Sequence, residues 1–329
     1  MKEIGGYFGL DNLVSNEYHK DLVSVNNGRN ALLYLMAAKN IQKVYVPYYL
    51  CDSVSGILER NNFPYEYYHV DSEFMPIFER ELSSNEYLYI VNLFGQITNI
   101  QVNDMMNKYG RIIFDNTHAF FQKPIKGIDT IYSVRKFFGV PDGAYLSTNA
   151  LLRADLEVDI SKDRMKHILG RFEGAGSEHY HSFHENDEVI DREPLKQMSR
   201  LTKNLLGAID YEEVRRTRNG NYGYLESRLK ESNGLQPVTP DGPFAYPFYV
   251  ENGIELRKQL AREKIYIPTL WPNVLENMPV ESVEYQYAAN ILPLPCDQRY
   301  DERDMEYMVE MLFNKMNIKK EKMASHLEL

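Results

Sequence analysis

The 329-residue chain has few cysteines, no basic excess and no long apolar run. Its two cysteines, Cys51 and Cys296, lie far apart and match no metal or redox spacing, so they indicate neither a disulfide framework nor an oxidising compartment. The formal net charge of -10 argues against binding along a nucleic-acid backbone, which needs a basic face. The first residues lack the apolar core of a signal peptide, and no apolar stretch approaches the roughly 18 residues of a membrane-spanning helix. We therefore expect a cytoplasmic protein without membrane or nucleic-acid partners.

Length and periodicity predict a large α/β domain followed by a smaller one. Apolar residues make up 43% of the chain and charged residues 26%, as in ordinary globular proteins. Strand patterns alternate with helix patterns through residues 1–193, which predicts crossover connections and a mostly parallel central sheet flanked by helices. The pattern of residues 194–322 predicts a smaller α+β domain, and we expect residues 323–329 to form a frayed tail.

Polar residues follow two apolar runs at the centre of the first domain. The runs RIIFD and DTIYS end at Asp115 and Ser133, and three residues beyond each end lie His118 and Lys136. The carboxyl ends of parallel strands meet at one edge of a sheet, where ligands bind, so we expect these side chains to converge. Asn92, at the end of the strand EYLYIVN, falls at the same edge.

A glycine opens the first predicted helix, in the run NNGRNALLYLMAAKN. Free backbone N–H groups at the positive end of a helix suit a phosphate, which makes Gly28, Arg29 and Asn30 candidates for binding one. An ordinary capped helix explains the same residues and stays an alternative.

Two other charged or polar segments have simpler interpretations. His179, His181 and His184 lie in a glycine-rich stretch of weak periodicity, which favours a mobile, irregular loop near the mouth of the site over a zinc centre. Arg215, Arg216 and Arg218 lie on a predicted helix, and we interpret them as a solvated face. We expect no metal site.

The residues at the sheet edge suit chemistry on pyridoxal phosphate. A lysine that follows a buried strand is partly desolvated, which frees its amine for a Schiff base. A neighbouring carboxylate can keep the pyridine nitrogen protonated, so that the ring acts as an electron sink. Asp115 and Lys136 suit these two tasks, His118 would lie against the ring, and Ser133 and the backbone at Gly28 would hold the phosphate.

Several segments resemble the DegT/DnrJ/EryC1/StrS family of fold type I pyridoxal-phosphate-dependent sugar aminotransferases. The similar segments are NNGRNALLYLMAAKNIQKVYVPYYLCDSV, YIVNLFGQ, IIFDNTHAF, KFFGVPDGA, QMSRLTKNLL and ILPLPCDQRYDERDM, which together span nearly the whole chain. The resemblance implies that Lys136 is the Schiff-base lysine, that Asp115 partners the pyridine nitrogen, and that His118 lies at the ring. It further implies a homodimer that moves an amino group, commonly from glutamate, to a keto sugar linked to a nucleotide.

The chain departs from the family pattern at three positions. Cys51 stands where an aromatic residue often stacks on the ring, a task that Tyr49 could take over. Ala144 replaces a glycine, and Leu195 stands where the family often has an asparagine. Two alternatives to an aminotransferase therefore remain. One is an enzyme for another pyridoxal-phosphate reaction, such as a lyase or dehydratase. The other is a catalytically inactive protein that retains the fold for binding or assembly.

Overall fold

An eight-stranded sheet forms the centre of the computed structural model, which describes residues 4–316; the predicted tail at 323–329 lies outside them. The strand order is β1-β8-β7-β6-β5-β2-β3-β4. Neighbours among β2, β3, β5, β6 and β7 run parallel, whereas β8 runs antiparallel to β7 and β1, and β4 antiparallel to β3. The predicted mostly parallel sheet is therefore confirmed. The strands are β1 (Val23–Val25), β2 (Lys43–Pro47), β3 (Tyr65–Val70), β4 (Pro76–Ile77), β5 (Glu86–Val91), β6 (Ile112–Asp115), β7 (Asp129–Ser133) and β8 (Ala144–Ser147).

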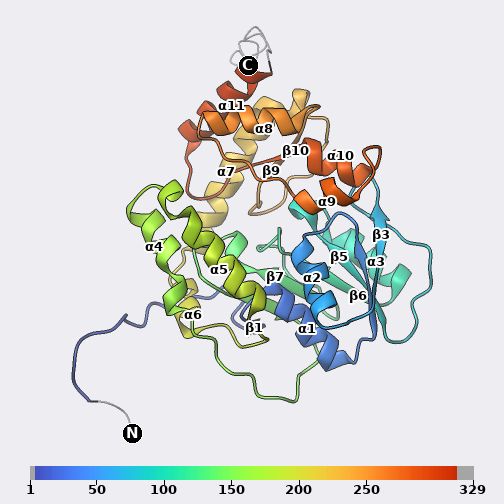
Figure 1. The fold of residues 1–329 in the computed structure, drawn as a ribbon, viewed down its shortest axis with the longest axis vertical. Coiled ribbons are helices and arrows are strands. Elements are labelled where there is room, and N and C mark those ends of the chain that lie inside the picture. Colours follow the sequence, from blue (N-terminus) through green and yellow to red (C-terminus); the bar gives the residue numbers. More distant parts are fainter. Residues whose placement is uncertain (1–3, 317–329) are drawn as a thin grey trace.

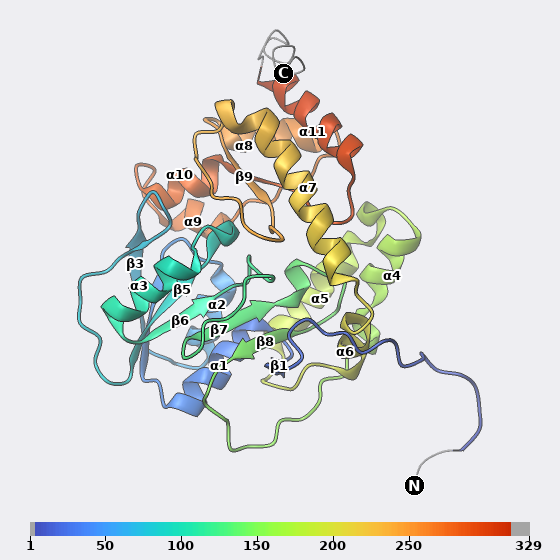
Figure 2. The ribbon, with the colours of Figure 1, turned by 180° about the vertical axis from the view of Figure 1, so that it is seen from behind.

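Helices cover both faces of this sheet. Figure 1 shows α1 (Gly28–Lys39), α2 (Asp52–Arg60) and α5 (Tyr180–Arg192) in front of it, and Figure 2 shows α3 (Asn99–Tyr109) on the opposite face. Within residues 4–316, no helix combines the length and the apolar character needed to span a membrane. The other helices are α4 (Lys166–Glu173), α6 (Arg200–Leu206), α7 (Tyr211–Leu229), α8 (Gly253–Arg262), α9 (Pro272–Asn277), α10 (Val283–Asn290) and α11 (Glu302–Lys315). Short 3-10 turns are η1 (Leu93–Gly95), η2 (Val134–Lys136), η3 (Lys162–Arg164), η4 (Gly176–His179) and η5 (Lys230–Ser232).

Local sequence explains where the elements near the site begin and end. Strand β6 is buried along its whole length and β7 up to its last residue, as expected of apolar runs covered on both sides. Helix α1 starts after Asn27, whose side chain accepts a hydrogen bond from Asn30 N. Helix α3 starts at Asn99, slightly earlier than its apolar period indicates, because Thr98 and Gln101 form a capping box.

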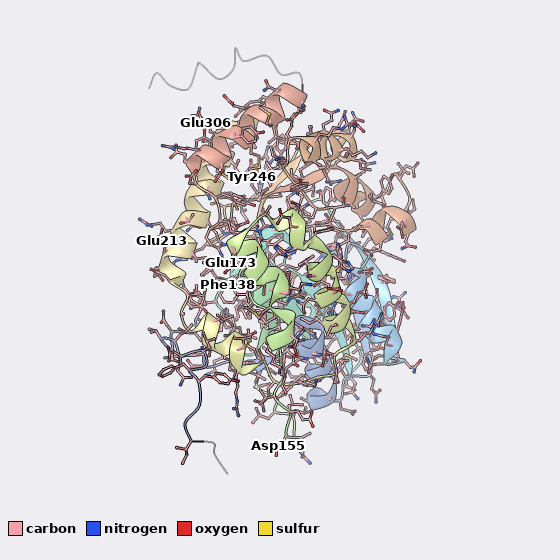
Figure 3. All side chains as sticks on the ribbon, turned by 60° about the vertical axis from the view of Figure 1, so that its left-hand side comes forward. Phe138, Asp155, Glu173, Glu213, Tyr246 and Glu306 are labelled. Carbon is pink, nitrogen blue, oxygen red and sulfur yellow. The ribbon has the colours of Figure 1, made fainter. Side chains whose placement is uncertain are left out.

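The C-terminal part builds a second apolar core on a two-stranded antiparallel sheet of β9 (Tyr246–Tyr249) and β10 (Ile291–Leu294). Helices α7, α8 and α11 pack around this sheet, giving the expected α+β composition. Figure 3 shows Tyr246 inside this part, with Glu213 and Glu306 on the outer sides of α7 and α11. The boundary at residue 194 stays a prediction, since α6 packs with Phe120 and Phe138 rather than with the second core.

Candidate active site

Asp115, His118, Ser133 and Lys136 line one cavity of about 1310 Å³. Strands β6 and β7 are parallel neighbours, and they end at Asp115 and Ser133. The turn η2 then carries the chain from Ser133 to Lys136. Six of the predicted residues lie along the cavity wall: Gly28, Arg29, Asp115, His118, Ser133 and Lys136. The sheet edge thus brings together an acid, an imidazole, a hydroxyl and an amine from separate segments.

Hydrogen bonds hold the Asp115 carboxylate in place. Its Oδ2 accepts from the Tyr89 hydroxyl at 2.5 Å, and its Oδ1 accepts from both the backbone N–H and the hydroxyl of Thr117. Burial raises the pKa of Asp115, while these donors and the charge of Lys136 act in the opposite direction. The result is a rotationally fixed, water-shielded carboxyl group that faces the cavity.

His118 is neutral at physiological pH. Burial, and then the nearby charge of Lys136, lower its pKa from 6.5 to about 3. Its Nδ1 accepts a long hydrogen bond (3.5 Å) from Phe94 N–H, which places the ring proton on Nε2. The ring stacks on Phe244, and the Trp271 ring lies nearly parallel at 6.0 Å. His118 can therefore act as a hydrogen-bond donor without carrying charge.

Three arginines along the same wall face acids of helix α5. Arg29 Nη1 lies 3.0 Å from Asp191 Oδ1, and Arg60 Nη1 lies 2.8 Å from Asp191 Oδ2. Arg135 pairs with Asp187. Burial lowers the pKa of Arg29, partly offset by Asp191. A guanidinium group remains cationic under such a shift, so the wall offers planar donors for an anion near the start of α1.

The turn after Lys136 requires glycine and is anchored by a carboxylate. Gly143 has φ +116, and a Cβ there would lie 2.7 Å from Val134 Cγ2. The buried Asp142 accepts hydrogen bonds from Ser199 N–H, Ser199 Oγ and Thr202 Oγ1. These bonds cap helix α6 and fix the return of the chain into β8.

Three of the predicted cofactor-binding residues lie outside the cavity wall. The Asn30 side chain donates to Asn26 and to the carbonyls of Glu193 and Pro194. Asn92 bonds Asn116, Gln122 and the backbone of Ile97. Tyr49 is fully buried and meets the Trp271 ring edge-on at 5.3 Å. The structure gives Asn30, Asn92 and Tyr49 packing or bracing contacts, and their cofactor contacts stay predictions.

The expectation of an irregular loop around His179, His181 and His184 is wrong. Residues 166–192 form α4, η4 and α5, which Figure 3 shows in front of the body. Helix α5 buries only Asn186 and Ile190, and it is held over the cavity by Asp187 and Asp191. Charged contacts leave a weak apolar period, which explains why sequence periodicity misses this helix. His184 lines the cavity, but within residues 4–316 no group of three ligating side chains could hold a metal ion.

The interpretation of the α7 arginines as a solvated face is correct for Arg216 and wrong for Arg218. Arg216 is exposed and pairs with Glu213 on the same helix. Arg218 is 1% exposed, and its guanidinium lies 4.5 Å from the centre of the Phe137 ring. Arg218 lies at helical spacing from the buried Tyr211, Tyr222 and Leu225, so the period of α7 could have placed it on the buried face.

Sequence reasoning also misses side chains that complete the site. Thr117 and Tyr89 hold Asp115, Arg135 adds a cation next to Lys136, and Trp271 contributes an aromatic wall. Thr117 and Arg135 lie inside the motifs and could have been inferred from their positions. Trp271 belongs to a segment far from these motifs in the sequence, and no local pattern predicts that it lies in the site.

Solved structures of aminotransferases share this fold over most of the chain. Among solved structures, a DegT DnrJ EryC1 StrS aminotransferase from Brucella abortus is 15% identical, with a TM-score of 0.58 over 91% of this chain and 86% of that chain. NtdA from Bacillus subtilis with bound cofactor PMP is 13% identical, with a TM-score of 0.64 over 90% of this chain and 73% of that chain. DesI, solved in the presence of its TDP-sugar product, is 13% identical, with a TM-score of 0.63 over 93% and 83%.

These similarities concern structure alone. No protein-family model matches the chain, and no curated protein matches it by sequence. Together with the sheet order, the solved structures confirm the fold class that the strand and helix pattern predicts.

Proposed function

We propose that this chain is a pyridoxal-phosphate-dependent aminotransferase of the DegT/DnrJ/EryC1/StrS type, which transfers an amino group from a donor such as glutamate to a keto sugar. The observation that carries the proposal is the convergence of Asp115 and Lys136 on one cavity that also includes the start of helix α1. An acid and an amine on neighbouring strand ends, beside a helix N-terminus for a phosphate, suit this cofactor's three reactive regions.

The residues present fit the cofactor. Lys136 would hold it covalently through Nζ, the Asp115 carboxylate would face its ring nitrogen, and Gly28 N–H with Ser133 Oγ would hold its phosphate. Arg29 and Arg135 line the same wall and could add charge-assisted hydrogen bonds to the phosphate. When bound, pyridoxal phosphate supplies an electron sink for the carbon whose amino group is exchanged.

The side chains of this chain supply binding and proton transfer. The side chain of Lys136 is exposed, so the partial desolvation expected from the sequence is not found. Its Nζ, once free, can still move a proton to and from the reacting carbon. The neutral His118 can donate from Nε2 without adding positive charge beside Asp115. Helix α5 lines one side of the cavity with His184, Asp187 and Asp191.

The substrate class rests on the size of the cavity and on the solved structures. About 1310 Å³ exceeds the usual volume of a small-metabolite pocket and leaves room for a sugar with a nucleotide attached. Structures of the same fold include the sugar aminotransferase CalS13 from Micromonospora echinospora and DesI with its TDP-sugar product. We therefore propose a nucleotide-linked keto sugar as acceptor. The homodimer implied by the resemblance and the cytoplasmic location expected from the composition stay predictions.

Capture of the cofactor at Lys136 tests the proposal. Purified protein should turn yellow with pyridoxal phosphate, and reduction with borohydride should leave a stable label on the peptide that contains Lys136. Lys136→Ala should stay unlabelled with an unchanged circular dichroism spectrum, whereas the exposed Lys126→Ala should be labelled like the wild type. A colourless wild type, or a label on other lysines alone, would refute the proposal.

A second assay tests the reaction. Glutamate should bleach the yellow protein, and a keto sugar linked to TDP should then be converted to an amino sugar detectable by mass spectrometry. Asp115→Asn should retain the label at Lys136 while turnover falls by about 100-fold or more, since the ring nitrogen loses its carboxylate. Turnover that survives unchanged in Asp115→Asn would contradict the role of Asp115.

A further inference from the structure

Arg218 stands apart from the other arginines of helix α7. Arg215 pairs with Glu212 and Asp241 on the surface, and Arg216 pairs with Glu213. Arg218 is 1% exposed, and none of the ion pairs within residues 4–316 includes it. The nearby Asp297 carboxylate is engaged by Arg299. A buried guanidinium without a carboxylate partner has to be satisfied by other acceptors.

The acceptors of Arg218 are two backbone carbonyls and one side-chain amide. Its Nη2 donates to Phe137 O at 3.2 Å, its Nη1 to Pro243 O at 2.7 Å and its Nε to Gln298 Oε1 at 2.8 Å. Gln298 Nε2 donates in turn to Phe137 O at 2.8 Å. The Phe137 carbonyl therefore receives two donors that both come from the C-terminal part of the chain.

The two carbonyls belong to residues that adjoin the site. Phe137 directly follows Lys136, and Pro243 directly precedes Phe244, the ring that stacks on His118. One planar guanidinium thus bridges the lysine turn and the segment that supports the imidazole. Burial lowers the pKa of Arg218 to about 10, so the group remains charged and its donors strong at neutral pH.

We propose that Arg218, with Gln298, is a positioning residue that holds Lys136 and the His118–Phe244 stack in register for reaction. Neither Arg218 nor Gln298 lines the cavity, so they act through the backbone of Phe137 and Pro243. Catalytic groups need such support, because displacements of about 1 Å can cost about 100-fold in rate. What Lys136 does chemically rests on the proposed function, whereas the contacts of Arg218 do not depend on it.

The test compares Arg218→Met with Arg257→Met. Arg257 is also a buried arginine of the C-terminal part, and it donates to the carbonyls of Ala288 and Ile291. Neither Arg257 nor these acceptors line the cavity, which makes it a control for the loss of a buried guanidinium. Thermal unfolding of both variants measures the structural cost.

Two readouts distinguish positioning from stability. In cofactor-free protein, NMR titration should show that Arg218→Met raises the pKa of His118 from about 3 toward 6.5, because the Phe244 segment loosens; Arg257→Met should leave it unchanged. In the loaded enzyme, Arg218→Met should lower kcat by about 100-fold with little change in KM. Arg218→Lys should recover part of this loss, since one ammonium can reach only some of the acceptors.

The outcomes separate the two proposals. If wild-type protein fails to capture pyridoxal phosphate, the proposed function fails, and the His118 titration alone still decides the role of Arg218. An unchanged His118 pKa in Arg218→Met, or equal effects of Arg218→Met and Arg257→Met, would overturn the positioning role.

Discussion

The imidazole of His118 lies flat on the ring of Phe244, with ring centroids 4.1 Å apart and an interplanar angle of 1°. His118 follows β6 in the large sheet, whereas Phe244 precedes β9 in the C-terminal part. The stack therefore joins two segments that are far apart in sequence. It also removes one face of the imidazole from water, which contributes to the burial that keeps His118 neutral.

Replacement of Phe244 should restore the ordinary titration of His118. In Phe244→Ala, water can reach the exposed ring face, so the pKa of His118 should rise from about 3 toward 6.5. NMR titration of labelled histidine measures this change. Phe172→Ala, at a side chain 90% exposed, serves as the control and should leave the titration unaltered. A His118 pKa that stays near 3 in Phe244→Ala would show that other neighbours alone keep water away.

Removal of Asp191 should strengthen anion binding. Asp191 pairs with Arg29 and Arg60, and an incoming phosphate has to compete with that carboxylate. Partly exposed ion pairs of this kind have interaction free energies of about 0.2–1 kcal/mol. Phosphate no longer has to break them in Asp191→Asn, so its affinity should rise by up to about fivefold. Isothermal titration calorimetry on cofactor-free protein measures the affinity, with the exposed Asp155→Asn as the control. Weaker or unchanged binding in Asp191→Asn would contradict an anion site at Arg29.

The backbone at Gly143 should resist substitution. Gly143→Ala places a Cβ against Val134 at a φ of +116, and we expect a loss of about 1–3 kcal/mol in the free energy of unfolding. Gly220→Ala is the matched control, because Gly220 lies inside α7 with nothing within 4 Å of its added Cβ. That control should gain about 0.5–1 kcal/mol from reduced backbone entropy. Urea unfolding measures both variants, and equal midpoints would disprove the strain at Gly143.

Acid should destabilise the fold before its carboxylates titrate. Burial lowers the pKa of His118 to about 3 and that of His19 to about 4, while the unfolded chain titrates near 6.5. The two neutral imidazoles therefore contribute fully to the free energy of unfolding above pH 6.5. This contribution is lost as the pH falls from 6.5 toward 4 for His19 and toward 3 for His118. At pH 5 each imidazole should lower the free energy of unfolding by about 2 kcal/mol relative to neutral pH, since one pH unit corresponds to about 1.4 kcal/mol.

Urea unfolding between pH 7.5 and pH 5 measures this loss. In His19→Asn, the free energy of unfolding should change about half as much between pH 7.5 and pH 5, because only one of the two buried imidazoles remains. Stability that is constant from pH 7.5 to pH 5 would show that these histidines are not buried in the neutral form.

The strand-end part of the site follows from sequence because it depends on local order. Apolar runs that end in Asp115 and Ser133 place those residues at the sheet edge whatever packs around them. The lysine turn follows within three residues, and Gly28 opens a helix that the apolar period already shows. Asn30, Asn92 and Tyr49 share these neighbourhoods, yet packing turns their side chains toward the backbone or into the core.

The mostly parallel sheet and the meeting of Asp115, Ser133 and Lys136 could be predicted from the sequence, because strand period and chain order act over short distances. Three features come from the folded chain: helix α5 lines the cavity, Phe244 stacks on His118, and Arg218 donates to the carbonyl next to Lys136. Those contacts join segments separated by long stretches of chain, and their energies come from burial and charge pairing that no local pattern records.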